Sequence, residues 1–238
     1  MTDQSESEFS SLAKKLQGVS VGTISLSLIK RGYRHCQIER IHPVTAASRF
    51  VGRARTLSTL PYREDKVADV QGERRSRNAH REIVNGTGPN DVIVVAARGV
   101  LHAAVIGDLL IECAKVNGAV AFVTDGAVRD TRNYPADFPV HAGATHTMTF
   151  RNVHAAAEIN VPVACGEVLV EPGDLIVGDE DGVVVVPWKI APEIVEASCE
   201  QEALDEFLKA KIAKGASLDD VAPPTEAVMA EYQKMNTR

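Results

Sequence analysis

The sequence lacks the patterns that mark several classes of protein. Its four cysteines, Cys36, Cys113, Cys165 and Cys199, are far apart and have no C-x-x-C spacing, which argues against a disulfide framework and a zinc knuckle. No apolar run approaches the ~20 residues that span a bilayer. The polar, acidic start MTDQSESEFSSLAKKLQ does not have the pattern of a signal peptide. These absences predict a soluble, cytoplasmic protein without a membrane partner.

Sequence motifs for binding nucleic acids, nucleotides, zinc and calcium are also absent. The formal net charge is -6 and no basic cluster is sustained, so we expect no nucleic-acid partner. Phosphate-binding motifs of the G-x-G-x-x-G and G-K-[ST] types do not occur. His141, His146 and His154 lack the helical i, i+4 spacing of zinc ligands. The acidic run at residues 179–181 lacks the spaced ligands of a calcium loop, so a hairpin turn is the better interpretation.

What remains is an ordinary globular composition, with 45% hydrophobic and 24% charged residues in a chain of 238. That length suffices for one well-buried domain with appendages. We expect three parts: an N-terminal lead-in, partly disordered, at residues 1–19, an α/β domain at residues 20–190, and a helical extension at residues 191–238 that packs on a neighbouring subunit.

The chain is organised around a predicted strand–helix–strand unit at residues 92–130. The runs VIVVAA and AVAFV are short, rich in β-branched residues and bounded by polar ones, which is typical of strands buried on both faces. We predict strands at residues 92–96 and 119–124, joined by a loop (98–107) and a helix (108–117). Because ligands of open α/β sheets bind outside the carboxyl ends of the strands, a crevice is expected where these two strands end.

Polar groups gather at that crevice. Asp108 is a good helix N-cap, and at that position it would leave the amides of Leu109 and Leu110 free to bind an anion. Arg129 and Asp130 follow the second strand. Taken alone, Asp108 could be a plain cap and the Arg129–Asp130 pair a structural ion pair in a turn. Asp125-Gly126 is interpreted as turn chemistry alone.

Other elements follow from periodicity and from glycine and proline punctuation. We predict two amphipathic helices between residues 9 and 32, one or two strands within 36–60, a helix at 78–85, strands at 137–142 and 145–150, four short β runs within 160–187, a long helix at 191–213, and a last helix after Pro224.

The combination of GDLL at Asp108, DGAVRD ending at Arg129 and Asp130, and the later VPV, PGD and DEDGVVVVP resembles the regulator of ribonuclease activity A (RraA) family. That family includes the class II 4-hydroxy-4-methyl-2-oxoglutarate and 4-carboxy-4-hydroxy-2-oxoadipate aldolases. The resemblance covers about residues 20–215. It implies an α/β fold of the β/β/α swivelling-domain type with a long C-terminal helix, and homotrimers or homohexamers with sites between subunits.

The resemblance also implies roles for individual residues. Asp130 would bind a divalent metal, usually Mg2+ but also Mn2+ or another ion. Arg129 would bind the 2-oxo acid, and Gly107 with the amides of Leu109 and Leu110 would hold its carboxylate. Asp108 would hold a metal-bound water. An acid from the C-terminal helix of an adjacent subunit would complete the site, and Asp205 and Glu202 are the nearest matches.

The activity implied is a metal-dependent retro-aldol cleavage of a 4-hydroxy-2-oxo di- or tricarboxylic acid to pyruvate, with oxaloacetate decarboxylation as a side activity because both pass through a pyruvate enolate. The central motif contains no catalytic lysine candidate, which argues against a Schiff-base aldolase. The run ERRSR has more arginine than the resemblance leads us to expect, so Arg75 or Arg77 could contact a further anionic group of the substrate. The alternative is a non-catalytic regulator that binds ribonuclease E; the intact D-x20-R-D spacing favours the enzyme.

Overall fold

The computed structural model describes residues 3–65 and 79–236. Its centre is a strongly curved mixed sheet with the strand order β1-β6-β5-β3-β2-β10-β11, in which β4 also pairs with β5, and β7 with β2. The pairs that join β2 to β3, β3 to β5, β5 to β6 and β4 to β5 are parallel, and the others are antiparallel. Parallel strands have their carboxyl ends at one edge, so this topology defines the edge where a site is expected.

The strands of this sheet are β1 (His42–Pro43), β2 (Phe50–Pro61), β3 (Asp91–Ala96), β4 (Ala104–Ile106), β5 (Ala121–Val128), β6 (Val140–Thr145), β7 (His154–Ile159), β10 (Leu175–Asp179) and β11 (Gly182–Val186). A separate hairpin is formed by β8 (Val163–Cys165) and β9 (Val168–Val170). The four β runs expected within 160–187 are therefore confirmed as β8 to β11.

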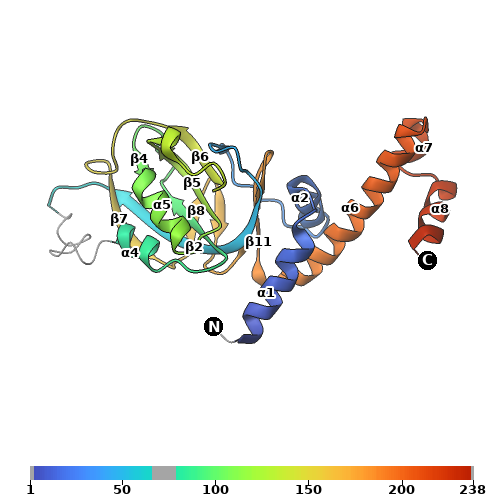
Figure 1. Cartoon of the computed structure of the whole chain (residues 1–238), viewed down its shortest axis with the longest axis horizontal. Helices are drawn as coiled ribbons and strands as arrows, with labels where there is room; N and C mark the ends of the chain where they lie inside the picture. The colour runs from blue at the N-terminus through green and yellow to red at the C-terminus, as the bar shows by residue number, and fades with distance from the viewer. Residues whose placement is uncertain (1–2, 66–78, 237–238) are drawn as a thin grey trace.

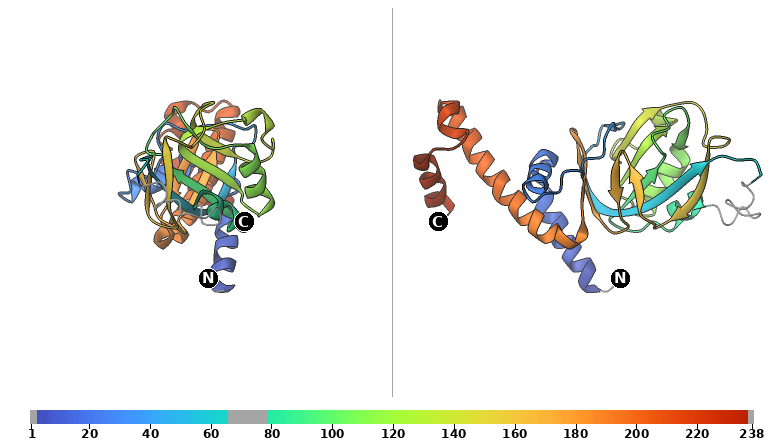
Figure 2. Two further views of the ribbon diagram at one scale, coloured as in Figure 1. Left: turned by 90° about the vertical axis from the view of Figure 1, so that its left-hand side faces the viewer. Right: turned by 180° about the vertical axis from the view of Figure 1, so that it is seen from behind.

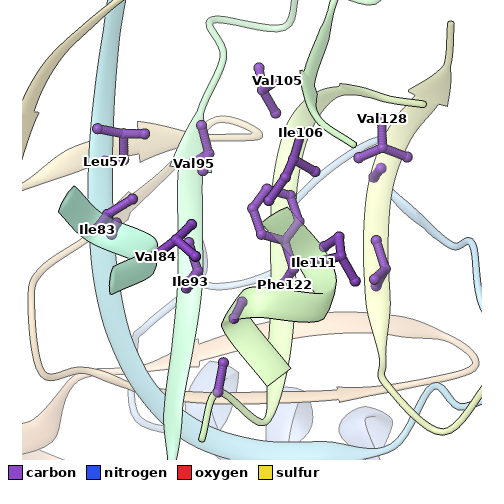
Figure 3. Close-up of a cluster of buried hydrophobic side chains, with 14 of the residues drawn as sticks. Leu57, Ile83, Val84, Ile93, Val95, Val105, Ile106, Ile111, Phe122 and Val128 are labelled. Atoms are coloured by element: carbon purple, nitrogen blue, oxygen red, sulfur yellow. The ribbon is translucent and has the colours of Figure 1, made fainter. Parts of the chain in front are cut away.

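Strand β3 is buried on both faces, as its apolar run predicts. Ile93 and Val95 point into one hydrophobic cluster beneath helices α4 (Ala79–Asn85) and α5 (Asp108–Val116). Val92 and Val94 point into a second cluster on the other face, together with the β8–β9 hairpin. Figure 3 shows the first cluster, with side chains of α4 and α5 facing the sheet. Burying each such side chain contributes roughly 1.5–3 kcal/mol, so these layers fix the central strands.

Helices gather at the other end of the molecule. Helix α1 (Asp3–Leu16) and helix α2 (Val21–Lys30) pack with β10, β11 and the first turns of the long helix α6 (Ala191–Ala213) in a third cluster. Beyond these contacts α6 projects away from the sheet and is followed by α7 (Leu218–Val221) and α8 (Glu226–Asn236), as Figures 1 and 2 show. Single-turn helices η1 (Thr131–Asn133) and η2 (Trp188–Ile190) complete the structure.

The α/β fold with a long C-terminal helix is confirmed, and α6 spans the predicted 191–213. Helix α1 begins at residue 3 within the lead-in, and partial disorder there stays a prediction. Two local predictions are wrong. Strand β5 continues to Val128, through the predicted turn at Asp125-Gly126. The segment expected to be a strand at 145–150 leaves the sheet after Thr145.

Within residues 3–65 and 79–236, we find no helix that is both long and apolar enough to cross a membrane. The division into parts at residues 19 and 190 stays a prediction.

Candidate functional site

The predicted site residues meet at the carboxyl edge of the parallel strands. Helix α5 begins immediately after β4, and Arg129 and Asp130 follow β5. The Arg129 amide donates a hydrogen bond to the Ile106 carbonyl at 3.1 Å, which joins the two strand ends. In Figure 3, Ile106 and Val128 lie at the same end of neighbouring strands, just before these polar residues. The sheet therefore brings together residues that are about twenty positions apart in the chain.

Gly107 lies directly against Arg129 and Asp130, which are called the RD pair below. A Cβ atom on Gly107 would be 3.2 Å from Asp130 Oδ2 and 3.3 Å from Arg129 Nε. The Gly107 backbone is extended, with φ -132° and ψ 178°, so the glycine is required here for close approach and not for an unusual backbone angle. Arg129 Nε lies 3.4 Å from Asp130 Oδ2, and both side chains are a little under half exposed. The pair is thus accessible to a ligand.

Asp130 has a left-handed backbone conformation, with φ 60° and ψ 28°. Asp and Asn adopt this conformation more readily than most residues other than glycine, although it is still uncommon. The turn is held by the Asn133 amide, which donates to the Asp130 carbonyl at 3.0 Å. Strained residues of this kind concentrate at functional sites, which supports a ligand role for Asp130.

Asp108 is the first residue of α5 and is not its N-cap, which corrects the prediction. Gly107 occupies the cap position and contributes no side-chain hydrogen bond. Asp108 Oδ1 accepts the Leu109 amide at 2.8 Å, and Oδ2 accepts the Asn133 carboxamide at 3.0 Å. A carboxylate in the first helical turn is favoured by the helix dipole. The carboxylate is oriented by two donors and faces the RD turn.

The prediction that the amides of Leu109 and Leu110 are free to bind an anion is wrong, because both amides are hydrogen-bonded within the chain. The Leu109 amide bonds to the Asp108 carboxylate, and the Leu110 amide donates to the Gly107 carbonyl at 3.2 Å. A ligand carboxylate could bind the Leu109 amide only by displacing Asp108. Leu109 is 83% exposed, so this turn of α5 faces solvent in the single chain.

Sequence reasoning missed the role of Asp125. This buried carboxylate accepts the Ala97 amide at 2.5 Å and the Gly99 amide at 2.8 Å. It therefore holds the loop between β3 and β4 against β5. A short polar side chain in an otherwise apolar strand was the signal that could have found it, because buried charges need compensating hydrogen bonds.

Asn133 and Tyr134 were also missed. Tyr134 is 7% exposed and belongs to the hydrophobic cluster beneath α4 and α5. Burial raises the pKa of Tyr134 well above its usual range, and the negative charge of Asp130 adds to the effect. Tyr134 therefore stays protonated and anchors the turn that carries Asp130. In the sequence, only the position of Asn133 and Tyr134 shortly after Arg129 and Asp130 could have indicated that they belong to the site.

The candidate acids of the C-terminal helix lie far from this site in the same chain, because α6 leaves the molecule at the end opposite α5 (Figure 1). Glu202 accepts the Ser20 amide at 3.1 Å. Burial by itself would raise the pKa of Glu202, but hydrogen bonds from Thr23 and Ser20 outweigh it and lower the pKa. Asp205 accepts the Gln201 carboxamide at 2.9 Å. Arg75 and Arg77 lie outside the described residues.

The donor set suits a hard cation that keeps much of its water. In the described part of the chain, no group of three or more His, Cys, Asp or Glu side chains could hold a metal ion. The groups around the RD turn are carboxylate and carboxamide oxygens from Asp108, Asp130 and Asn133. Mg2+ prefers oxygen ligands and is commonly held by one or two carboxylates plus water and substrate. The residues present fit such an ion, with Asp130 as the candidate ligand.

Comparison with known proteins identifies relatives of this chain. A protein of Halalkalibacterium halodurans named "Putative 4-hydroxy-4-methyl-2-oxoglutarate aldolase" is 41% identical over 119 residues, which are 50% of this chain and 56% of that protein. The match thus spans little more than half of that relative. The crystal structure of Streptomyces coelicolor RraAS2, described as an unusual member of the RNase ES inhibitor RraA protein family, is 31% identical, with a TM-score of 0.72 over 84% of this chain and 96% of that chain.

A structure of an uncharacterized protein from Pseudomonas syringae pv. tomato has a TM-score of 0.75 at 23% identity, covering 89% of this chain and 96% of that one, which shows the shared fold. The family model described as RraA-like, Aldolase/RraA, matches residues 21–185, a span that contains every residue of the RD site. The chain belongs to the RraA-like (Aldolase/RraA) family.

Proposed function

We propose that the protein is a divalent-metal-dependent lyase that cleaves a 4-hydroxy-2-oxo di- or tricarboxylic acid to pyruvate by a retro-aldol reaction, with oxaloacetate decarboxylation as a side activity. The observation that carries the proposal is the convergence of Asp108, Arg129 and Asp130 around Gly107. The similarity to the Halalkalibacterium protein named as an aldolase supports it.

Each residue has a task in this reaction. Arg129 is a fixed cation whose guanidinium can bind the 2-oxo acid through two oxygens. Asp108, oriented by two donors, holds a water that removes the proton from the C4 hydroxyl and later returns one to the enolate carbon. Because Asp108 Oδ1 already accepts the Leu109 amide, the substrate carboxylate would bind Arg129 and not the start of α5.

Asp130 would hold the cation. When bound, a divalent ion such as Mg2+ stabilises the negative charge that develops on the C2 oxygen. The left-handed turn presents the Asp130 carboxylate beside Gly107, which has no side chain, and leaves the Asp130 side chain 42% exposed.

We propose that residues 191–238 pack on a neighbouring subunit in a trimer or hexamer. The extension exposes apolar side chains: Ile212 (46%), Leu218 (67%) and Met235 (54%). Glu202 accepts the amide of Ser20 at the start of α2, whereas the hydrogen bond that Asp205 accepts comes from Gln201 of its own helix. Asp205 is therefore the better candidate for completing a neighbour's site. Light scattering after size-exclusion chromatography would test the assembly, and a monomer at micromolar concentration would contradict it.

A second candidate is a protein-binding regulator of the ribonuclease E type, which the similarity to RraAS2 favours. A regulator that works only by surface contact does not need an oriented Asp108 carboxylate or a strained Asp130. The two functions therefore differ in whether these residues are required.

The test is pyruvate release from 4-hydroxy-4-methyl-2-oxoglutarate, 4-carboxy-4-hydroxy-2-oxoadipate and oxaloacetate, coupled to lactate dehydrogenase, with Mg2+ or EDTA. Asp130→Asn keeps a residue that tolerates the left-handed backbone and removes the charge, so it should lower kcat by roughly a hundredfold or more. Asp137→Ala, which removes an exposed carboxylate paired with Lys115, is the matched control. If folded wild-type protein releases no pyruvate and binds no Mg2+, the regulator becomes the better hypothesis.

A further inference from the structure

Asn133 connects the two halves of the site. Its carboxamide donates to Asp108 Oδ2 at 3.0 Å, and its backbone amide donates to the Asp130 carbonyl at 3.0 Å. Asp108 belongs to the start of α5, whereas Asp130 belongs to the turn after β5. In the described part of the chain, Asn133 is the only side chain that hydrogen-bonds Asp108. One residue therefore couples the orientation of one carboxylate to the backbone that carries the other.

Asn133 is itself held in place. It is the last residue of η1, and the next residue, Tyr134, is buried in the cluster beneath α4 and α5. The Tyr134 amide donates to the Thr131 carbonyl at 3.1 Å, which closes the turn. Because the backbone is fixed on both sides of Asn133, its short side chain has few rotamers with which to reach Asp108.

The hydrogen bond contributes little to folding. Asn133 and its contact with Asp108 are exposed to solvent, so water competes for both groups and the net stabilisation is small. Its geometric effect is larger, because the Leu109 amide fixes Oδ1 and Asn133 fixes Oδ2. With both oxygens held, the plane of the Asp108 carboxylate is determined, and a misoriented base loses much of its catalytic effect.

We propose that Asn133 is a positioning residue of this site, which holds the Asp108 carboxylate in the orientation needed for proton transfer. The inference rests on the proposed lyase function. It assigns the turn after the RD motif a task beyond carrying Asp130, and it predicts that Asn133 acts only through Asp108.

A double-mutant cycle tests this inference. Asn133→Leu should lower kcat about tenfold, which corresponds to ~1.4 kcal/mol, with KM changed less than about threefold. In an Asp108→Asn background the same substitution should change kcat less than about twofold. Asn133→Asp, which replaces the donor with a second carboxylate, should be worse than Asn133→Leu. Asn133→His, whose Nδ1 can donate from nearly the same position, should restore kcat to within about threefold of wild type.

Asn117→Ala is the matched control, because the Asn117 carboxamide donates to the Val84 carbonyl at 2.9 Å at the other end of α5. It should lower the melting temperature and leave kcat unchanged. An equal loss of kcat for Asn133→Leu in both backgrounds, or no loss in wild type, would overturn the positioning role.

A second readout does not depend on turnover. Calorimetry with Mg2+ and oxalate, a planar mimic of the pyruvate enolate, should show the same affinity for Asn133→Leu as for wild type within about threefold, because Asn133 acts on proton transfer and not on binding. A loss of affinity as large as the loss of kcat would overturn the positioning role. Failure of wild-type protein both to bind oxalate and to release pyruvate would instead reject the proposed function, and with it this inference.

Discussion

Gly107→Ala is the sharpest single perturbation of the site, because one methyl group would contact both residues of the RD pair. The added Cβ would lie 3.2 Å from Asp130 Oδ2 and 3.3 Å from Arg129 Nε. Favourable contacts of a methyl carbon begin near 3.5 Å. Asp130 Oδ2 must therefore move away by about 0.3 Å and Arg129 Nε by about 0.2 Å, and both by more if they relax to an optimal distance.

The stability change should be small. The Gly107 backbone angles are accessible to alanine, and replacing glycine at a compatible position stabilises by roughly 0.4–1 kcal/mol through the unfolded chain. The displaced side chains of Arg129 and Asp130 are partly exposed and can move at little cost. We expect the free energy of unfolding to change by less than about 1 kcal/mol.

The activity change should be large, because catalysis depends on the distance between Arg129, Asp130 and the substrate. Misplacements below 1 Å lower rates by up to about a hundredfold, so we expect kcat/KM for pyruvate release to fall roughly ten- to a hundredfold. The control is Gly18→Ala, since a Cβ there would have no neighbour within 4 Å. Urea unfolding measures stability in parallel. If folded Gly107→Ala keeps activity within twofold of wild type, the assignment of Gly107 to the substrate contact is refuted.

Two further predictions concern stability. Asp125→Asn replaces with a donor one of the two carboxylate oxygens that accept the buried Ala97 amide and the part-buried Gly99 amide, so it should lower the free energy of unfolding by roughly 2–4 kcal/mol. The exposed Asp181→Asn should change it by less than about 0.5 kcal/mol, and equal effects would contradict the role of Asp125 in holding the loop. Burial lowers the pKa of both His80 and His154 to about 4. The unfolded chain then binds more protons between about pH 6.5 and 4, so stability should fall as pH falls through that window. His154→Gln should make the melting temperature depend less on pH between pH 6.5 and 5. An unchanged dependence would argue against a contribution from the lowered pKa of His154.

The central layer of the fold could be predicted because its signals are local. The run VIVVAA places β-branched residues on both faces of β3, and each face is covered by a hydrophobic cluster. Helix α6 ends before Gly215, which has φ 95°, as that glycine predicts. The expected tight turn joins β10 to β11 at Glu180 and Asp181, since Asp179 pairs with Gly182. In these elements, periodicity and punctuation agree with the final packing.

The segment after Thr145 shows where alternation misleads. HTMTF alternates like a strand, yet no ladder forms along it. Instead the Met148 carbonyl accepts a hydrogen bond from the Ala104 amide at 2.8 Å. The Phe150 ring stacks on two histidine rings, with centroid distances of 4.8 Å to His80 and 5.3 Å to His154. A period of two indicates a strand only when a neighbouring strand is available, and the sequence does not contain that information.

The site depends on a contact of Asp125 whose partners the local sequence pattern does not identify. Asp125-Gly126 has the composition of a turn, and a carboxylate in a buried strand would be costly without partners. The partners are amides of residues 97 and 99, supplied by the neighbouring strand's loop. A side chain on Gly126 would be only 2.4 Å from the Ala97 Cβ atom, so the glycine permits the loop to lie against β5. Because these two residues allow β5 to continue to Val128, Arg129 and Asp130 reach Gly107 and do not end at an earlier turn. The pair interpreted as turn chemistry alone is what extends the strand to the site.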